Sequence, residues 1–206
     1  MALSTFVKIS GVTNLSDARY SSGMYVDVIG FCLDEASEKF VPPTLFSEIT
    51  GWVSGCDFCA EFKDDDSHVV SQKLSKYQNI SWIQHNHLDV LLEFADQGYQ
   101  LIFEAPLQEI RHIEDEVAEK IKTKGIHLLL TTDSATLDGD QLKSVALIAK
   151  KAKVILAGGI SPFNVKSLIN DLNLFGIALE GGEEIKPGLK DYDELAEILE
   201  ELEIED

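Results

Sequence analysis

Eight short runs of apolar, β-favouring residues recur along the chain, and this repetition constrains the fold more than any other feature. Consecutive runs begin roughly 20–30 residues apart, which is the length of one strand, one helix and the loops that join them. The runs cover residues 6–10, 28–33, 57–62, 80–85, 100–105, 127–132, 153–158 and 176–181. We therefore expect eight strands that alternate with helices.

Segments between the runs have the periodicity of amphipathic helices. In three of them, apolar residues recur every three or four positions, as on the buried face of a helix. These three segments are residues 110–121, 165–172 and 195–202. Ser161 with Pro162 predicts an N-cap followed by proline in the first helical turn. Asp191 with Glu194 three residues later resembles a capping box and predicts a second helix start.

This alternation predicts a single (β/α)8 TIM barrel that spans residues 1–206. The chain is short for such a barrel, so its loops must be short. A doubly wound open sheet is the alternative fold, but it usually contains fewer strands. No G-x-G-x-x-G motif follows the first run, so the sequence gives no support to a dinucleotide-binding sheet.

Composition and charge limit the partners of the protein. Hydrophobic residues make up 45% of the 206 residues, which is enough for a substantial core. The 17 basic and 36 acidic side chains give a net charge of −19, which disfavours nucleic acid and anionic membrane surfaces as partners. Three cysteines are too few and odd in number for a disulfide framework, and the first residues lack a signal-peptide pattern. A cytoplasmic monomer or homodimer is expected.

Two glycine pairs follow the seventh and eighth runs, where a barrel of this kind usually binds phosphate. They are Gly158 with Gly159 and Gly181 with Gly182. Glycine lets backbone N–H groups approach an anion closely, and a following helix adds the positive end of its dipole. We predict a phosphate-binding site at these four residues. The alternative is that the glycines only form tight turns between strand and helix.

Three segments resemble the phosphoribosylanthranilate isomerase family. Residues 7–18 with 28–31 are similar to its opening motif K-I-C-G-L-T…D-A…I-G-F. Leu-Ala-Gly-Gly-Ile-Ser-Pro-Phe-Asn-Val at 156–165 resembles its L-A-G-G-L-x-P-x-N-V motif. Residues 181–191 resemble its S-G-V-E-x-x-P-G-x-K-D motif. These segments occur in the same order as in the family and extend over nearly the whole chain.

The resemblance implies an aldose–ketose isomerisation of a phosphoribosyl amine in tryptophan biosynthesis, with a small phosphorylated sugar as ligand and no cofactor or metal. Ser10 occupies the position of the catalytic base, where the family has cysteine. Thr131 occupies the position of the acidic aspartate, and Asp133 is a substitute two residues further on. Lys39 and Gln84 occupy substrate-binding positions.

The replaced acid and base leave the activity open between three hypotheses. A serine hydroxyl is a much weaker base than a thiolate, and threonine is no acid at neutral pH. The first hypothesis is an isomerase of this type or a relative that acts on a similar phosphosugar. The second is a non-catalytic phosphosugar-binding or regulatory barrel. The third is a metal-dependent enzyme that uses His85 and His87 with Glu61 or Glu104, although polar residues lining a solvated mouth are the simpler interpretation.

Acidic side chains near the second glycine pair oppose the predicted phosphate site. Glu180 and Glu183 flank this pair, and carboxylates beside a phosphate dianion would repel it. Lys186 or Lys190 is expected to neutralise them if the site is retained. The remaining acids after the eighth run are expected on the solvated face of the last helix.

Overall fold

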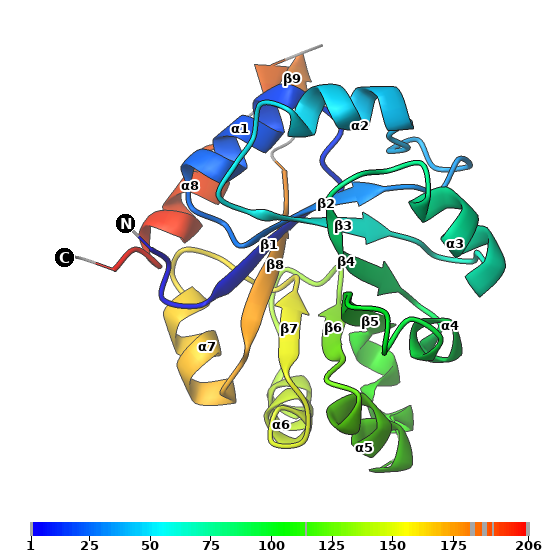
Figure 1. Ribbon diagram of the computed structural model, residues 1–206. Helices are drawn as coiled ribbons and strands as arrows, with labels where there is room; N and C mark the ends of the chain where they lie inside the picture. Colours follow the sequence, from blue (N-terminus) through cyan, green and yellow to red (C-terminus); the bar gives the residue numbers. More distant parts are fainter. Residues whose placement is uncertain (1, 114, 182–183, 187–188, 191, 205–206) are drawn as a thin grey trace.

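The structure is a computed structural model that describes residues 2–113, 115–181, 184–186, 189–190 and 192–204. Its centre is a closed barrel of eight parallel strands in sequence order (Figure 1). The strands are β1 (Phe6–Ser10), β2 (Val28–Cys32), β3 (Asp57–Glu61), β4 (Ile80–His85), β5 (Gln100–Pro106), β6 (His127–Thr131), β7 (Val154–Ala157) and β8 (Gly176–Glu180). The barrel closes where β1 pairs with β8, from Phe6 opposite Gly176 to Ser10 opposite Glu180. The predicted (β/α)8 barrel is confirmed.

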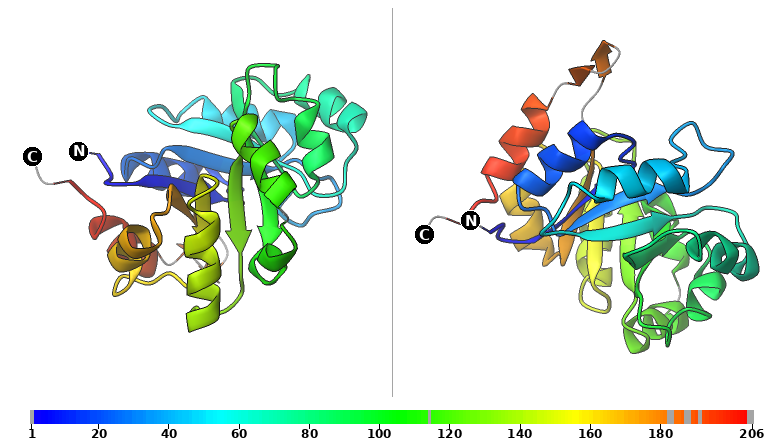
Figure 2. Two further views of the ribbon diagram at one scale, coloured as in Figure 1. Left: turned by 90° about the horizontal axis from the view of Figure 1, so that it is seen from below. Right: turned by 45° about the horizontal axis from the view of Figure 1, so that its top comes forward.

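Helices follow the strands and surround the barrel (Figure 1). They are α1 (Leu15–Gly23), α2 (Pro43–Thr50), α3 (Ser67–Leu74), α4 (Leu88–Leu92), α5 (Asp115–Thr123), α6 (Gly139–Ile148), α7 (Val165–Leu172) and α8 (Asp193–Glu200). A short antiparallel hairpin of β9 (Glu184–Lys186) and β10 (Leu189–Lys190) separates β8 from α8 and projects from the barrel (Figure 2). No helix within the described residues is both long and apolar enough to cross a membrane.

Two predicted helix boundaries differ from the structure. The apolar pattern at 110–121 is divided between a 3₁₀ helix, η1 (Leu107–His112), and α5, so it is not one continuous helix. The start predicted at Ser161 is wrong, because α7 begins at Val165. The side chain of Asn164 accepts a hydrogen bond from the Ser161 N–H at 2.8 Å and closes a turn there instead. The capping box predicted at Asp191 lies outside the described residues.

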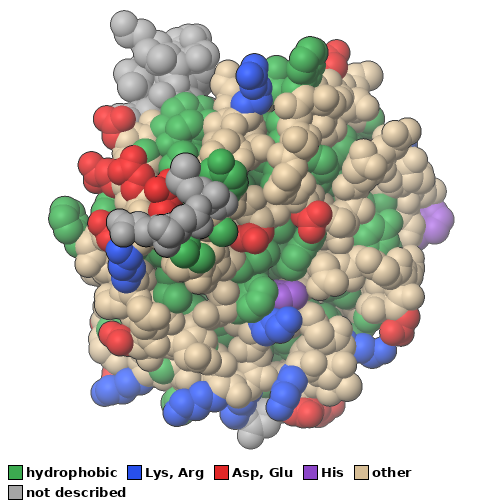
Figure 3. Space-filling view, turned by 60° about the vertical axis from the view of Figure 1, so that its left-hand side comes forward, with side chains coloured by type: hydrophobic (Ala, Val, Ile, Leu, Met, Phe, Trp, Pro, Cys, Tyr) green, Lys and Arg blue, Asp and Glu red, His purple; other side chains and the backbone are tan. Residues whose placement is uncertain are grey.

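The last helix has the charge distribution expected from its sequence. Leu195, Ile198 and Leu199 of α8 are buried against the barrel. Glu194 and Glu197 are exposed on its outer side. Figure 3 shows a group of acidic side chains on this side of the molecule, with several basic side chains along its lower edge. The acidic residues of this helix therefore lie in solvent, where their charge keeps the surface hydrated.

Side chains fill the lower part of the barrel interior. Successive residues of a strand point to opposite sides, so every second residue faces the barrel axis. One buried apolar cluster occupies this interior and consists of Val28, Cys59, Trp82, Ile102, Leu129, Ile155 and Ala178. Phe6 and Phe175 pack against the same cluster. Because this end is filled, chemistry is confined to the opposite end, where the strands have their carboxyl termini.

His127 lies among these aromatic side chains and is 2% exposed. Its ring centroid is 4.7 Å from that of Phe175 and 5.1 Å from that of Trp82. Nδ1 is 3.3 Å from the carbonyl oxygen of Leu101. Burial, with a further contribution from the positive charge of Lys153, lowers the pKa of His127 to about 4. The imidazole is therefore neutral in the folded protein at neutral pH.

This histidine predicts acid sensitivity. The unfolded chain, with an ordinary histidine pKa near 6.5, binds a proton that the folded state excludes, so stability falls as the pH drops below about 6.5 towards 4. We expect His127 to contribute about 2 kcal/mol to the loss of unfolding free energy between pH 7.5 and pH 5. Urea unfolding of wild type and His127→Gln at both pH values measures this contribution. Equal pH dependence in the two proteins would contradict it.

Candidate active site

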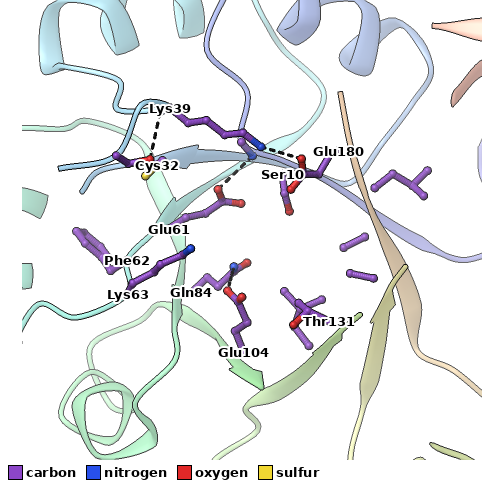
Figure 4. A pocket seen from close by; sticks show the side chains of 16 residues that line it. Ser10, Cys32, Lys39, Glu61, Phe62, Lys63, Gln84, Glu104, Thr131 and Glu180 are labelled. Atoms are coloured by element: carbon purple, nitrogen blue, oxygen red, sulfur yellow. Dashed lines mark hydrogen bonds and ion pairs between the residues drawn. The ribbon is translucent and has the colours of Figure 1, made fainter. Parts of the chain in front are cut away.

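A cavity of about 190 Å³ opens at the carboxyl ends of the strands, and Figure 4 shows its lining. Residues from all eight strands line it, together with Lys39 from the loop after β2. The structure brings together Ser10, Lys39, Gln84 and Thr131 of the predicted site. Asp133 is exposed in the loop after β6 and does not belong to the lining.

A buried ion pair forms the floor of the cavity. Lys8 on β1 is 0% exposed, and its ammonium group pairs with Oε1 of Glu61 on β3. The other Glu61 oxygen accepts a hydrogen bond from the Gly11 N–H at 3.1 Å. Glycine at position 30 makes room for the pair, because a Cβ there would lie 2.0 Å from Glu61 Oε1. Burial is the largest single influence and opposes the charge of Lys8, but Glu61, Cys59 and Glu104 together outweigh it, so the pKa of Lys8 is raised.

The protonated Lys8 determines what Ser10 can do. Lys8 Nζ donates a hydrogen bond to Ser10 Oγ at 2.6 Å. An ammonium group has no lone pair, so it cannot remove the proton of the serine hydroxyl. Its positive charge also lowers the basicity of the oxygen it contacts. Ser10 therefore lines the cavity as a hydroxyl that can donate to a ligand, and its contact with Lys8 does not activate it as a base.

Thr131 ends β6 and contributes a hydroxyl group to the opposite side of the cavity (Figure 4). It is half-buried, and the strand directs its side chain towards the barrel axis. A threonine hydroxyl donates and accepts hydrogen bonds but does not release its proton at neutral pH. Both residues at the predicted base and acid positions, Ser10 and Thr131, therefore supply neutral hydroxyl groups.

Lys39 crosses the rim of the cavity and is already paired. Its Nζ lies 2.7 Å from Glu180 Oε2 at the end of β8. The Lys39 stem passes over Gly11, where a Cβ would lie 3.1 Å from Lys39 Cδ. Lys39 neutralises Glu180, the role that the sequence suggested for Lys186 or Lys190. Glu183 and the side chains of those two lysines lie outside the part of the chain that the structure describes.

Gln84 and Glu104 form a polar pair on neighbouring strands. Gln84 Nε2 donates to Glu104 Oε2 at 2.7 Å. Gln84 is 6% exposed, and its Oε1 is buried without a hydrogen-bond partner among the described residues. A carboxylate only accepts hydrogen bonds, so the amide nitrogen must face Glu104 and leaves the oxygen without a donor. A buried unsatisfied acceptor that lines a cavity indicates a ligand with a donor group.

The loop after β7 has the geometry of an anion-binding turn. Gly158 and Gly159 have positive φ angles of 98° and 68°. Their missing side chains allow close packing, because Cβ atoms would lie 1.9 Å from the Thr132 carbonyl oxygen and 2.0 Å from Leu137 Cδ1. Within the described residues neither glycine N–H donates to a protein acceptor. Asn164 Nδ2 fixes the turn by donating to the Gly159 carbonyl at 2.9 Å.

The second predicted glycine pair is only partly described. Gly181 directly follows β8 and is half-buried. Gly182 lies outside the described residues, so the predicted phosphate loop is defined here by Gly158 and Gly159. Their loop adjoins the mouth through Ala157, the last residue of β7, which lines the cavity.

The ring of His85, one of the two histidines of the metal hypothesis, already makes hydrogen bonds within the protein. His85 accepts a hydrogen bond at Nδ1 from the His87 N–H at 2.9 Å. Its Nε2 therefore carries the proton and donates to the Asp65 carbonyl at 2.8 Å. Both ring nitrogens are occupied, and burial lowers the pKa of His85. The described residues contain no group of three potential ligands placed to hold a metal ion.

A closed parallel barrel with a polar cavity at the carboxyl ends of its strands defines the class of (β/α)8 barrel proteins. Within this class, residues 7–201 match the family described as N-(5'phosphoribosyl)anthranilate (PRA) isomerase, PRAI, and the chain belongs to this family. The match confirms the resemblance predicted from the three sequence segments.

Individual relatives agree with this assignment. The chain is 27% identical over 198 residues to N-(5'-phosphoribosyl)anthranilate isomerase of Thermotoga neapolitana, covering 94% of this chain and 96% of the relative. It is 28% identical over 202 residues to the protein of the same name from Geobacter metallireducens, with the same coverage. The crystal structure of the Thermotoga maritima enzyme has a TM-score of 0.78 at 21% identity and covers 96% of this chain and 98% of its own.

A further solved structure contains a ligand. It is a phosphoribosyl anthranilate isomerase in complex with reduced 1-(o-carboxyphenylamino)-1-deoxyribulose 5-phosphate, with a TM-score of 0.76 at 22% identity. It covers 96% of this chain and 98% of its own. At this identity the likeness establishes the shared fold.

Proposed function

We propose that the protein binds a phosphorylated ribosyl amine, or a closely related phosphosugar, in the mouth of its barrel. The observation that carries this proposal is the loop after β7, where the Gly158 and Gly159 N–H groups have no acceptor among the described residues and Asn164 fixes the turn. Such backbone N–H groups are suited to a phosphate oxygen. The family name and the ligand in one relative's structure point to the same chemical class.

Isomerisation is the reaction that family membership associates with this ligand. The ring-opened sugar must lose a proton from C2, the hydroxyl-bearing carbon next to the imine carbon C1. This step requires a base. Ser10 is not this base, because it accepts a hydrogen bond from the Lys8 ammonium group. The two hydroxyl groups of Ser10 and Thr131 are suited to hold the sugar, and any proton transfer falls to another side chain in the cavity.

A second candidate function is phosphosugar binding without turnover. The hydrogen bond from Lys8 to Ser10 favours it, since it leaves the family's base position inactive. The two candidates differ in a single measurement. Purified protein is incubated with N-(5'-phosphoribosyl)anthranilate, and formation of the ketose product is followed. Product formation above the uncatalysed rate supports the isomerase, whereas tight binding without product supports the second candidate.

The phosphate loop predicts a specific loss of affinity. Gly159→Ala places a Cβ where Leu137 lies and requires an alanine at a φ of 68°, so the loop must shift. Left-handed backbone at a non-glycine residue costs about 1–3 kcal/mol. We expect affinity for reduced 1-(o-carboxyphenylamino)-1-deoxyribulose 5-phosphate, measured by titration calorimetry, to fall at least about tenfold.

A matched control separates loop geometry from general backbone strain. Gly98 also has a positive φ, 88°, but a Cβ there meets nothing within 4 Å, and the residue does not line the cavity. Gly98→Ala is therefore expected to bind the phosphorylated ligand as wild type does. If Gly159→Ala and Gly98→Ala bind equally well, the phosphate does not lie at the β7 loop.

A further inference from the structure

Three carboxylates of the described part of the chain line the cavity, and they differ in what already occupies their oxygens. Both oxygens of Glu61 are engaged, one by Lys8 and the other by the Gly11 N–H. Glu180 lies at the rim, where it pairs with Lys39 and its side chain is 70% exposed. Glu104 has one hydrogen bond, from Gln84 to Oε2, and interacts electrostatically with Lys8, but the described residues supply no hydrogen bond to its other oxygen. Glu104 is therefore the carboxylate with an oxygen free to take up a proton inside the mouth.

The position of Glu104 is fixed from two sides. On β5 its side chain points towards the barrel axis, like that of the buried Ile102 two residues earlier, and lies nearer the carboxyl end of the strand. Its carboxylate is oriented by Gln84, which is itself nearly completely buried. Figure 4 shows Glu104 and Gln84 together in the cavity, with Thr131 on the neighbouring side. A base held by a buried partner keeps one orientation and needs little rearrangement when a ligand binds.

The unsatisfied oxygen of Gln84 indicates which ligand group binds next to Glu104, namely a hydrogen-bond donor such as a hydroxyl. Gln84 Oε1 is a buried acceptor to which no described residue donates, and it belongs to the same amide that holds the Glu104 carboxylate. A ligand hydroxyl at Gln84 Oε1 places the carbon that bears it beside Glu104. The pair therefore offers an acceptor for an O–H and a base for a C–H of one carbon atom. C2 of an aldose is such a carbon, because it carries a hydroxyl group and a hydrogen atom and lies next to the carbonyl carbon C1.

We propose that Glu104 is the base that removes this proton from a bound phosphosugar, while Gln84 Oε1 accepts the hydrogen bond from the hydroxyl on the same carbon. The proposal rests on the phosphosugar binding proposed above and assigns its chemical step. The Glu104 carboxylate takes the proton from C2 of the ring-opened sugar imine. The electron pair of the C2–H bond forms the C1=C2 double bond, and the C1=N electron pair moves to nitrogen, which takes up a proton.

The resulting enol amine becomes the ketose when its C2 hydroxyl loses a proton and C1 gains one. The protonated Glu104 is placed to return the proton it removed. One proton thus moves from C2 to C1, and the carbonyl-level carbon moves from C1 to C2 without any external oxidant or reductant. Glu104 ends the reaction as the carboxylate with which it began, as a catalyst requires.

Glu104→Gln tests the proposal because it keeps the shape of the side chain and removes its basicity. We expect turnover of N-(5'-phosphoribosyl)anthranilate to fall by at least about 100-fold. Exchange of a deuterium label from C2 of the substrate into water is expected to fall in parallel, whereas KM and the affinity for the reduced ligand stay within about threefold. Glu104→Asp keeps the carboxylate and is expected to recover part of the rate. A role in folding alone would not move label exchange separately from binding.

Glu109→Gln is the matched control, since it makes the same chemical change at an exposed residue of η1 that does not line the cavity. It is expected to leave turnover and label exchange unchanged. Turnover of Glu104→Gln within threefold of wild type would overturn the proposal. Wild type that binds the reduced ligand but shows neither turnover nor exchange would also overturn it and leave the binding function intact. Wild type that fails to bind would overturn the proposed function and this step with it.

Discussion

Lys8→Met is expected to lower the free energy of unfolding by about 3–5 kcal/mol, which is the usual cost of leaving one member of a buried ion pair without its partner. The substitution keeps an unbranched side chain only one atom shorter but leaves the Glu61 carboxylate in the barrel floor without its cation. The remaining hydrogen bond to Glu61, from the Gly11 N–H, does not replace a full charge. Urea unfolding monitored by circular dichroism measures the loss.

Lys39→Met provides the comparison for this experiment. Lys39 also pairs with a glutamate, but both side chains are at least half exposed, so solvent screens their interaction. Exposed pairs of this kind contribute under about 1 kcal/mol. The double variant Lys8→Met with Glu61→Leu is expected to recover much of the lost stability, because no uncompensated charge remains. Similar losses for Lys8→Met and Lys39→Met would contradict the assignment of a buried ion pair.

The charges around the cavity explain how an acidic protein can hold an anionic ligand. Lys8 neutralises Glu61 in the floor, and Lys39 neutralises Glu180 at the rim. The net charge of −19 therefore repels an anion in the cavity less than the composition suggests, because these two carboxylates are neutralised. The phosphate binding proposed at Gly158 and Gly159 uses backbone N–H groups as donors, which bind an anion without a charged side chain. Glu180 would repel a phosphate, but Lys39 neutralises its charge. The sequence predicted a substrate-binding role for Lys39 instead.

The strands were predictable because parallel barrel strands are buried on both faces and therefore read as continuous apolar runs. The runs at 6–10 and 80–85 coincide with β1 and β4, and the others differ at their ends by a residue or two. The start of α7 was not predictable from Ser161 and Pro162. The side chain of Asn164 accepts a hydrogen bond from the Ser161 N–H, so residues 161–164 form a turn before the helix. The helix therefore begins at Val165.

Pairings within the site were less predictable, because they join residues that are distant in sequence. Lys39 and Glu180 are 141 positions apart, and nothing local connects them. Gln84 and Glu104 sit on adjacent strands, but their contact depends on the register of β4 and β5. The contact between Lys8 and Ser10 did have a local signal, since residues two apart on a strand share a face.

Restoring the two family residues is expected to raise isomerase turnover. Ser10→Cys puts a thiol beside the Lys8 ammonium group, whose positive charge favours the thiolate and makes it a stronger base than the hydroxyl. Thr131→Asp adds a carboxyl group to the side of the cavity that holds Glu104, and a neighbouring negative charge favours the protonated form that an acid requires. Each positioned proton-transfer group contributes about 10²–10⁴ to a rate, so the double variant is expected to exceed wild type at least about 100-fold in kcat/KM.

Ser10→Ala with Thr131→Asn is the control, because it alters the same two positions without supplying a base or an acid. The two single variants are expected to gain less than the double variant, since an aldose–ketose isomerisation needs both ring opening and proton removal. A double variant that binds the reduced ligand but turns over no faster than the control would show that the scaffold no longer places the sugar between these two positions.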